Sequence, residues 1–119
     1  MNKTVMIVED ELFFRELLRD ILEKADYTVV AEAADGIEAL AKYRQLRPDI
    51  IIMDIFMPGK NGIEATQEIV SFDPQAKVFM CSGVGYTEDV EAALQAGAKG
   101  VILKPFFPEE ILQVIRSAA

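Results

Sequence analysis

Five polar side chains that could carry phosphate or metal chemistry each follow a short apolar run. They are Glu9, Asp10, Asp54, Ser82 and Lys104. If the apolar runs are parallel strands, their carboxyl ends meet at one edge of a sheet, where ligands bind in open α/β folds. Polar residues also end strands simply because strands end at water. Three acids, a hydroxyl and a lysine at successive strand ends are more than that explanation requires, so we expect one shared site.

Like charges in a small site repel each other and raise each other's pKa. The count of three acids against Lys104 leaves a surplus of negative charge that a divalent cation would relieve. The chain contains no histidine, so the metal must be a hard cation held by oxygen atoms. We expect Mg²⁺, with Mn²⁺ as the alternative.

A magnesium site beside a lysine suits phosphoryl chemistry, because both cations neutralise phosphoryl oxygens during in-line attack. With no histidine in the chain, a carboxylate is the candidate nucleophile, and its product is an aspartyl phosphate. Asp54 is the best placed, since it ends the middle apolar run. The chain has no Gly-rich loop followed by Lys-Ser or Lys-Thr, which argues against a P-loop kinase or GTPase.

Composition excludes several other classes of protein. The 119 residues are 51% hydrophobic and include 20 acids against 12 bases, a net charge of −8. A single domain spanning residues 1–119 with a real core is expected, without direct nucleic-acid binding, which needs clustered Lys and Arg. Without histidine, catalytic triads that use it, His-ligated zinc and phosphohistidine carriers are excluded. Short apolar runs and the lack of a signal-peptide core predict a cytoplasmic protein with no membrane insertion.

The elements that must position the five side chains alternate along the chain. The apolar runs are Val5–Val8, Thr28–Ala31, Ile50–Met53, Val78–Cys81 and Val101–Leu103. Their continuous, β-branched character is typical of strands covered on both faces. Five strand-helix repeats predict a doubly wound α/β fold: a five-stranded parallel sheet with five helices, flavodoxin-like. Of the two common strand orders, 2-1-3-4-5 suits five strands and is the one expected.

The stretches between the apolar runs are predicted to be helices. The first carries Phe14, Leu17, Leu18, Ile21 and Leu22 at helical spacing, and the second carries Ile37, Leu40, Ala41 and Arg44. Asp35 and Asn61 precede the second and third helices, Gly97 ends the fourth, and Pro108 opens the fifth.

Together these residues resemble the receiver domain of two-component response regulators, and among these the single-domain chemotaxis regulators most. The matching segments are Ile7-Val8-Glu9-Asp10, Pro48-Asp49-Ile50, Met53-Asp54-Ile55-Phe56-Met57-Pro58, Asn61-Gly62, Ser82-Gly83, Gly97-Ala98 and Lys104-Pro105-Phe106. The resemblance covers residues 3 to about 117. It implies phosphorylation-dependent signalling, in which a partner sensor histidine kinase or phosphotransfer domain donates the phosphoryl group and a downstream protein reads the change.

The resemblance also implies a role for each site residue. Asp54 matches the phosphoacceptor, and Asp10, Glu9 and the main-chain carbonyl of Phe56 match the metal ligands that act beside it. Lys104 matches the lysine that grips a phosphoryl oxygen, through a cis peptide bond to Pro105. Ser82 matches the switch hydroxyl. The family catalyses only its own magnesium-dependent phosphotransfer and autodephosphorylation, so the chain is expected to be a signalling module, not an enzyme with a separate substrate.

Three positions depart from the family pattern. Val101 stands where receivers commonly have the aromatic residue that rotates on activation. Phe56, two residues after Asp54, and Val84, two residues after Ser82, are apolar where many chemotaxis-type relatives are polar. In the family these last two positions influence how water reaches the acyl phosphate.

The sequence leaves two other hypotheses about function open. One is an aspartyl-phosphate phosphohydrolase or mutase, although Phe56 stands where such enzymes carry a second Asp and no cap domain follows. The other is a receiver that binds partners without phosphorylation, against which the complete set of acids and Lys104 argues. The sequence does not identify the cognate kinase, the output or the oligomeric state. It leaves open both a stand-alone regulator and a receiver excised from a longer protein.

Overall fold

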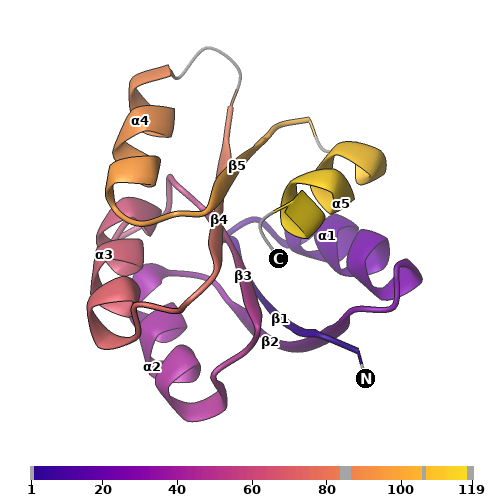
Figure 1. Cartoon of the computed structure of the whole chain (residues 1–119), viewed down its shortest axis with the longest axis horizontal. Coiled ribbons are helices and arrows are strands. Elements are labelled where there is room, and N and C mark those ends of the chain that lie inside the picture. Colours follow the sequence, from indigo (N-terminus) through magenta and orange to yellow (C-terminus); the bar gives the residue numbers. More distant parts are fainter. Residues whose placement is uncertain (1, 84–86, 106, 118–119) are drawn as a thin grey trace.

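Strands and helices alternate throughout the computed structural model, which describes residues 2–83, 87–105 and 107–117 (Figure 1). The elements are β1 (Thr4–Val8), α1 (Leu12–Lys24), β2 (Thr28–Ala33), α2 (Gly36–Leu46), β3 (Ile50–Asp54), α3 (Gly62–Phe72), β4 (Val78–Ser82), α4 (Thr87–Gln95), β5 (Gly100–Leu103) and α5 (Pro108–Ser117). The five strands are parallel and lie in the order β2-β1-β3-β4-β5. The predicted fold and strand order are confirmed.

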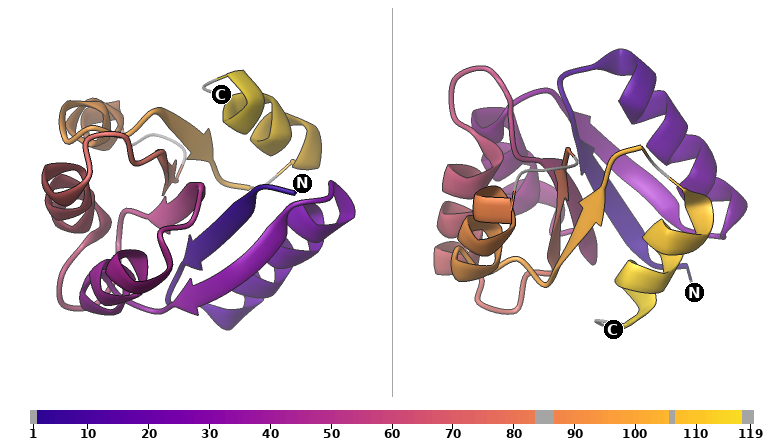
Figure 2. Two further views of the ribbon diagram at one scale, coloured as in Figure 1. Left: turned by 60° about the horizontal axis from the view of Figure 1, so that its bottom comes forward. Right: turned by 90° about the horizontal axis from the view of Figure 1, so that it is seen from above.

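The helices form two layers, one on each face of the sheet. Helices α1 and α5 cover one face, and α2, α3 and α4 cover the other (Figures 1 and 2). Successive residues of a strand alternate between the layers: Ile52 packs toward α1 and α5, while Ile51 and Met53 pack toward α2 and α3. Continuous apolar strands are therefore required, as the sequence pattern indicated.

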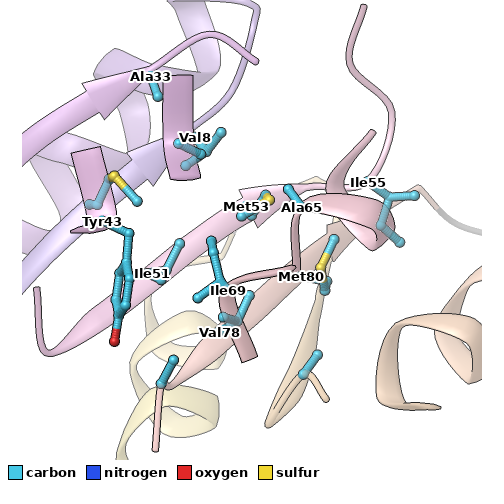
Figure 3. Packing of buried hydrophobic residues seen from close by; sticks show 14 of the residues in the cluster. Val8, Ala33, Tyr43, Ile51, Met53, Ile55, Ala65, Ile69, Val78 and Met80 are labelled. Atoms are coloured by element: carbon cyan, nitrogen blue, oxygen red, sulfur yellow. The ribbon is translucent and has the colours of Figure 1, made fainter. Parts of the chain in front are cut away.

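Figure 3 shows the core on the α2–α3 face, where Ile51, Val78 and Met80 of the sheet meet Ile69 of α3. All four side chains are fully buried. Each such burial stabilises the fold by roughly 1.5–3 kcal/mol relative to exposure. The strands that carry the candidate site are thus held rigidly from both sides.

Local signals mark the ends of the helices as predicted. The side chain of Asp35 accepts a hydrogen bond from the Glu38 amide (2.8 Å), and Asn61 accepts one from the Glu64 amide (2.9 Å). Both caps satisfy a backbone donor that has no partner within its helix. Pro108 is the first residue of α5, and Gly97 follows α4 with a φ of 112°.

Helix α2 forms where the sequence predicted a helix, and the structure shows which of its residues are buried. Ile37 is 66% exposed, and Ala41 is exposed as well. Ala39 and Tyr43 are buried instead, and the Tyr43 hydroxyl donates a hydrogen bond to the Asp73 carboxylate (2.7 Å). The Tyr43 ring also meets the ring of Phe72, the last residue of α3, edge to face.

All five helices are short, and the longest, α1, has 13 residues. Among the described residues, no helix is long and apolar enough to cross a membrane.

Candidate functional site

Three carboxylates converge at the carboxyl edge of the sheet. Glu9 and Asp10 directly follow β1, and Asp54 is the last residue of β3, the neighbouring strand. One carboxylate oxygen from each lies within 4.8 Å of the other two. Glu9 (1% exposed) and Asp54 (7%) are buried, whereas Asp10 is exposed. The structure thus brings together the acids that the strand ends predicted.

Contacts from both neighbouring elements fix the position of Glu9. Its backbone N–H donates to the carbonyl of Ala33 at the end of β2 (2.9 Å). Its carbonyl accepts a bond from the Arg15 guanidinium of α1 (2.7 Å), and its carboxylate accepts one from the Asp10 amide (3.1 Å). The buried carboxylate is therefore held beside Asp54 by the fold itself.

Lys104 reaches the same point from β5. Its Nζ lies 3.1 Å from Glu9 Oε1 and 3.4 Å from Asp54 Oδ1. The ammonium also sits 4.4 Å from the centre of the Phe14 ring, a cation–π contact from α1. The Lys104 backbone N–H donates to the Ser82 carbonyl (2.9 Å), and its peptide bond to Pro105 is cis, as predicted.

The close acids change the electrostatics of the site. Burial raises the pKa of the Glu9 carboxyl to about 8, and hydrogen bonding and repulsion with Asp54 add to this, while Lys104 opposes it. Burial alone would lower the pKa of Lys104, but its bond to Glu9 and the charges of both acids raise it. Lys104 therefore stays charged, and Glu9 carries a proton over much of the neutral range when no metal is bound.

The donor set fits a hard divalent cation. Three carboxylates stand against one lysine, and their oxygens are close enough to share one ion. Mg²⁺ binds one or two carboxylates and keeps several waters, so it needs an open position. The exposed side chain of Asp10 provides that open side.

Ser82 ends β4 with its side chain buried. Its hydroxyl donates to the Gly83 carbonyl of its own chain (3.2 Å). Val101, three residues before Lys104, packs half-buried against the core on the α2–α4 face. The predictions that involve Val84 and Phe106 concern positions outside the residues that the structure describes.

Phe56 lies two residues beyond the end of β3, and its side chain is 56% exposed. It borders an open depression together with Asp10, Pro58 and Asn61. The ring thus stands beside the exposed acid at the mouth of the site. The proposed use of its carbonyl as a metal ligand remains a prediction.

Sequence reasoning missed the positioning roles of Phe14, Arg15 and Gly62. A Cβ on Gly62 would lie 2.1 Å from the Asp54 carbonyl oxygen, so the first turn of α3 approaches Asp54 as only glycine allows. The Gly62 N–H donates to the Ile55 carbonyl (2.8 Å) and ties that turn to the end of β3. Gly62 could have been found from the match of Asn61-Gly62 to the receiver family. No pattern in the sequence links Phe14 to Lys104.

A parallel sheet in this order, with buried acids and a lysine at its carboxyl edge, defines a class of signalling domain. The family model described as "Response regulator receiver domain" matches residues 5–116, and the chain belongs to this family. It is a receiver domain of two-component signalling.

Its similar proteins include chemotaxis regulators. The chain is 46% identical to the chemotaxis protein CheY of Thermotoga maritima over 119 residues, which is 100% of this chain and 99% of that protein. It is 43% identical to CheY of Listeria monocytogenes, over 97% of each chain. A chain of the CheX–CheY–BeF3–Mg complex from Borrelia burgdorferi superposes with a TM-score of 0.92 at 36% identity, over 97% of this chain and 87% of that one.

Proposed function

We propose that Asp54 accepts a phosphoryl group from a phosphohistidine of a partner sensor histidine kinase or phosphotransfer domain. The observation that carries this proposal is the position of the Asp54 carboxylate, which has Lys104 Nζ at 3.4 Å and one oxygen each of Glu9 and Asp10 within 4.8 Å. The chain has no histidine, so the phosphohistidine must come from the partner.

In the transfer, an Asp54 carboxylate oxygen attacks phosphorus in line, the P–N bond breaks, and its electron pair stays on the imidazole nitrogen. Lys104 has to leave its contact with Glu9 to hold a phosphoryl oxygen. The Ser82 hydroxyl has to turn from the Gly83 carbonyl to donate to the phosphoryl group. These two movements change the ends of β4 and β5, and we propose that the change alters contacts with a downstream protein.

We propose that Glu9, Asp10 and Asp54, with the Phe56 carbonyl, hold Mg²⁺, or Mn²⁺ in its place. When bound, the cation supplies positive charge that stabilises the phosphoryl oxygens. Glu9 must lose its proton as the ion enters, since a ligating carboxylate is ionised. Asp10 is exposed, so its carboxylate offers the first contact to an entering ion.

Beyond this self-catalysed phosphotransfer and the hydrolysis of the phosphoryl group on Asp54, we propose no reaction with a separate substrate. Residues 1–119 would act as one receiver unit, and we place the exchange in the cytoplasm, where two-component kinases present their phosphohistidine. The similarity to CheY proteins supports a chemotaxis-like output carried by protein contacts.

Incubation with acetyl phosphate and Mg²⁺, followed by intact-mass measurement, tests the proposal. We expect one added phosphoryl group, none without Mg²⁺, and none in Asp54→Asn. A phosphohydrolase would consume acetyl phosphate over many turnovers without accumulating the modified chain. An unmodified chain with intact acetyl phosphate would overturn the proposal in favour of a receiver that binds partners without phosphorylation.

A further inference from the structure

The amino end of the sheet, opposite the acidic rim, has a small hollow of about 180 Å³. Its lining residues are Lys3, Tyr27, Ile50, Lys77, Ile115 and Arg116. They come from the starts of four strands or the residues just before them and from the last turns of α5, which lies beside the start of β1 (Figure 2, right). Ile50 and Asp54 stand at opposite ends of β3, about 13 Å apart at the usual rise per residue. The hollow is therefore separate from the phosphoacceptor.

Three of the 12 basic residues of this acidic chain line the hollow. Within the described ranges, Lys3, Lys77 and Arg116 form no ion pair within 4.0 Å. The basic residues that do form such pairs are Arg15, Arg19, Lys24, Lys42, Arg47, Lys60 and Lys104. In a chain with a net charge of −8, three cations that form no ion pair with another described residue are unexpected around one concavity.

The carboxylate of Asp49 lies near two of these cations, Lys3 and Lys77. Asp49 accepts hydrogen bonds from the backbone N–H of Thr4 (2.8 Å) and from its hydroxyl (3.1 Å). The bond from the Thr4 amide lowers the pKa of Asp49, and the charges of Lys3 and Lys77 add to this. The six residues that line the hollow include three cations and no carboxylate, so the lining itself is positively charged.

The floor of the hollow is apolar. Ile50 and Ile115 are buried, and the half-buried Tyr27 contributes a ring beside them. The Tyr27 hydroxyl makes no hydrogen bond with other described residues, so it is available to a ligand. At the rim, the planar guanidinium of Arg116 can bind a carboxylate with two parallel hydrogen bonds.

We propose that this hollow is a binding site for a small organic monocarboxylate with a flat, single-ring apolar body. The cations at the rim recognise the carboxylate, and Ile50, Ile115 and Tyr27 contact the ring. The volume is about six times the share of one water molecule in the liquid, which suits a single ring and is below the usual range for larger ligands.

Titration of the full-length chain with benzoate, followed by amide NMR shifts, tests the site directly. We expect saturable shifts at the amides of Tyr27, Lys77 and Arg116, without comparable shifts at Asp54. Benzamide has the same shape without the charge, and inorganic phosphate has charge without the ring. Each should bind at least about tenfold more weakly, because each lacks one of the two contributions.

Lys77 and Lys99 form a matched pair for substitution. Each directly precedes a strand, β4 or β5, neither forms an ion pair among the described residues, and only Lys77 lines the hollow. Lys77→Gln should weaken benzoate binding about fivefold, the scale of one partly exposed charge, while Lys99→Gln leaves it unchanged. Arg116→Gln, at an exposed helix end, provides a second variant that keeps the fold intact.

Several outcomes would overturn the proposal. The absence of saturable shifts would remove the site. Equal binding of benzamide would show an apolar cavity without anion recognition, and equal binding of phosphate would show that the floor contributes nothing. An equal loss in Lys77→Gln and Lys99→Gln would reduce the effect to the overall charge of the chain.

Discussion

Two carboxylates at opposite ends of the same sheet are held in opposite electrostatic states. At the carboxyl edge, burial and Asp54 raise the pKa of Glu9 to about 8. At the amino edge, hydrogen bonds from Thr4 and the charges of Lys3 and Lys77 lower the pKa of the exposed Asp49. At the carboxyl edge a buried acid is pushed toward its neutral form, and at the amino edge hydrogen bonds and two lysines stabilise an ionised acid.

The difference follows from how parallel strands gather their ends. All amino ends lie on one edge and all carboxyl ends on the other, so residues of one charge placed after successive strands must become neighbours. Repulsion at the carboxyl edge costs stability, and a metal or phosphoryl group would relieve it. Active sites often carry such a cost, because function needs an arrangement that stability alone would not select.

The largest expected effect tests how tightly the carboxyl edge is built. Gly62→Ala places a Cβ 2.1 Å from the Asp54 carbonyl oxygen and 2.7 Å from Met80 Cε. A backbone oxygen cannot move away without moving Asp54, so we expect a loss of about 4 kcal/mol in the free energy of unfolding, measured by urea denaturation. Phosphorylation by acetyl phosphate should fall as well.

Gly59→Ala is the matched control, since Gly59 has a φ of 71° but a Cβ there would meet nothing within 4 Å. It should cost only the strain of the left-handed backbone, about 1 kcal/mol. Similar losses of stability in Gly62→Ala and Gly59→Ala would show that α3 can shift away from Asp54. Close packing of α3 against Asp54 would then not be required for stability.

The next prediction concerns the pH dependence of stability set by Glu9. Its pKa in the folded chain, about 8, exceeds the unfolded value near 4.5, so the folded state binds more protons between these limits. The stability of the metal-free chain should therefore fall as pH rises from about 5 to 9. Glu9→Gln should remove this fall and be more stable by about 3 kcal/mol at pH 9.

The measurement is urea denaturation across this pH range without divalent metal, with Glu16→Gln as the control on an exposed site of α1. The same Glu9→Gln substitution should weaken Mg²⁺ binding, and the wild-type chain should release protons on binding Mg²⁺ below about pH 8. The prediction would be wrong if the stability of the wild-type chain did not change with pH, or if Glu9→Gln and Glu16→Gln showed the same dependence of stability on pH. Either result would show that its neighbours do not raise the pKa of Glu9.

Asp49→Asn should have the opposite sign. The lowered pKa of Asp49 means that its contribution is present above pH 4 and is lost as pH falls further. The variant weakens the bonds from the Thr4 amide and hydroxyl, so we expect a loss of about 1 kcal/mol at pH 7, seen as a lower melting temperature. The difference from wild type should disappear near pH 2. A stabilised Asp49→Asn chain would remove the contrast between the two edges.

Most of the fold was predictable because strands, caps and breaks are encoded locally. Asp35 and Asn61 cap the helices that follow them, and Gly97 stands at the end of α4, each by an interaction within a few residues. The sequence predicted helix α2 but did not show which of its faces is buried. Ala39 and Tyr43 are inside because Tyr43 bonds Asp73, 30 residues away, and no local period reveals such a partner.

The residues of the candidate site also fall into those that local sequence predicts and those that depend on tertiary contacts. Glu9, Asp10, Asp54 and Lys104 were found because each marks a strand end, and strand ends meet by topology. The cation–π contact between the Phe14 ring and Lys104 joins α1 to the residue after β5, and it is a tertiary contact between segments far apart in sequence. The side chains proposed to act at the site were therefore predictable from strand ends, whereas the contact of Phe14 with Lys104 was not.

The smallest predicted effect asks whether the carboxyl edge controls water as well as charge. Phe56 stands beside Asp10 at the mouth of the site with its ring 56% exposed, so it can screen only part of the approach to a phosphoryl group on Asp54. Phe56→Asn offers a hydrogen bond to an attacking water in place of a hydrophobic surface. We expect the acyl phosphate of Phe56→Asn to hydrolyse about threefold faster than that of the wild type, a decrease of about 0.7 kcal/mol in the activation barrier.

Phe107→Asn is the control, because Phe107 is 55% exposed but does not border the depression. Decay is followed by intact mass after removal of acetyl phosphate, with single-exponential rates compared among the three chains. Equal or slower decay in Phe56→Asn would show that this ring does not limit water attack, and the carboxyl edge would then govern the lifetime through charge alone.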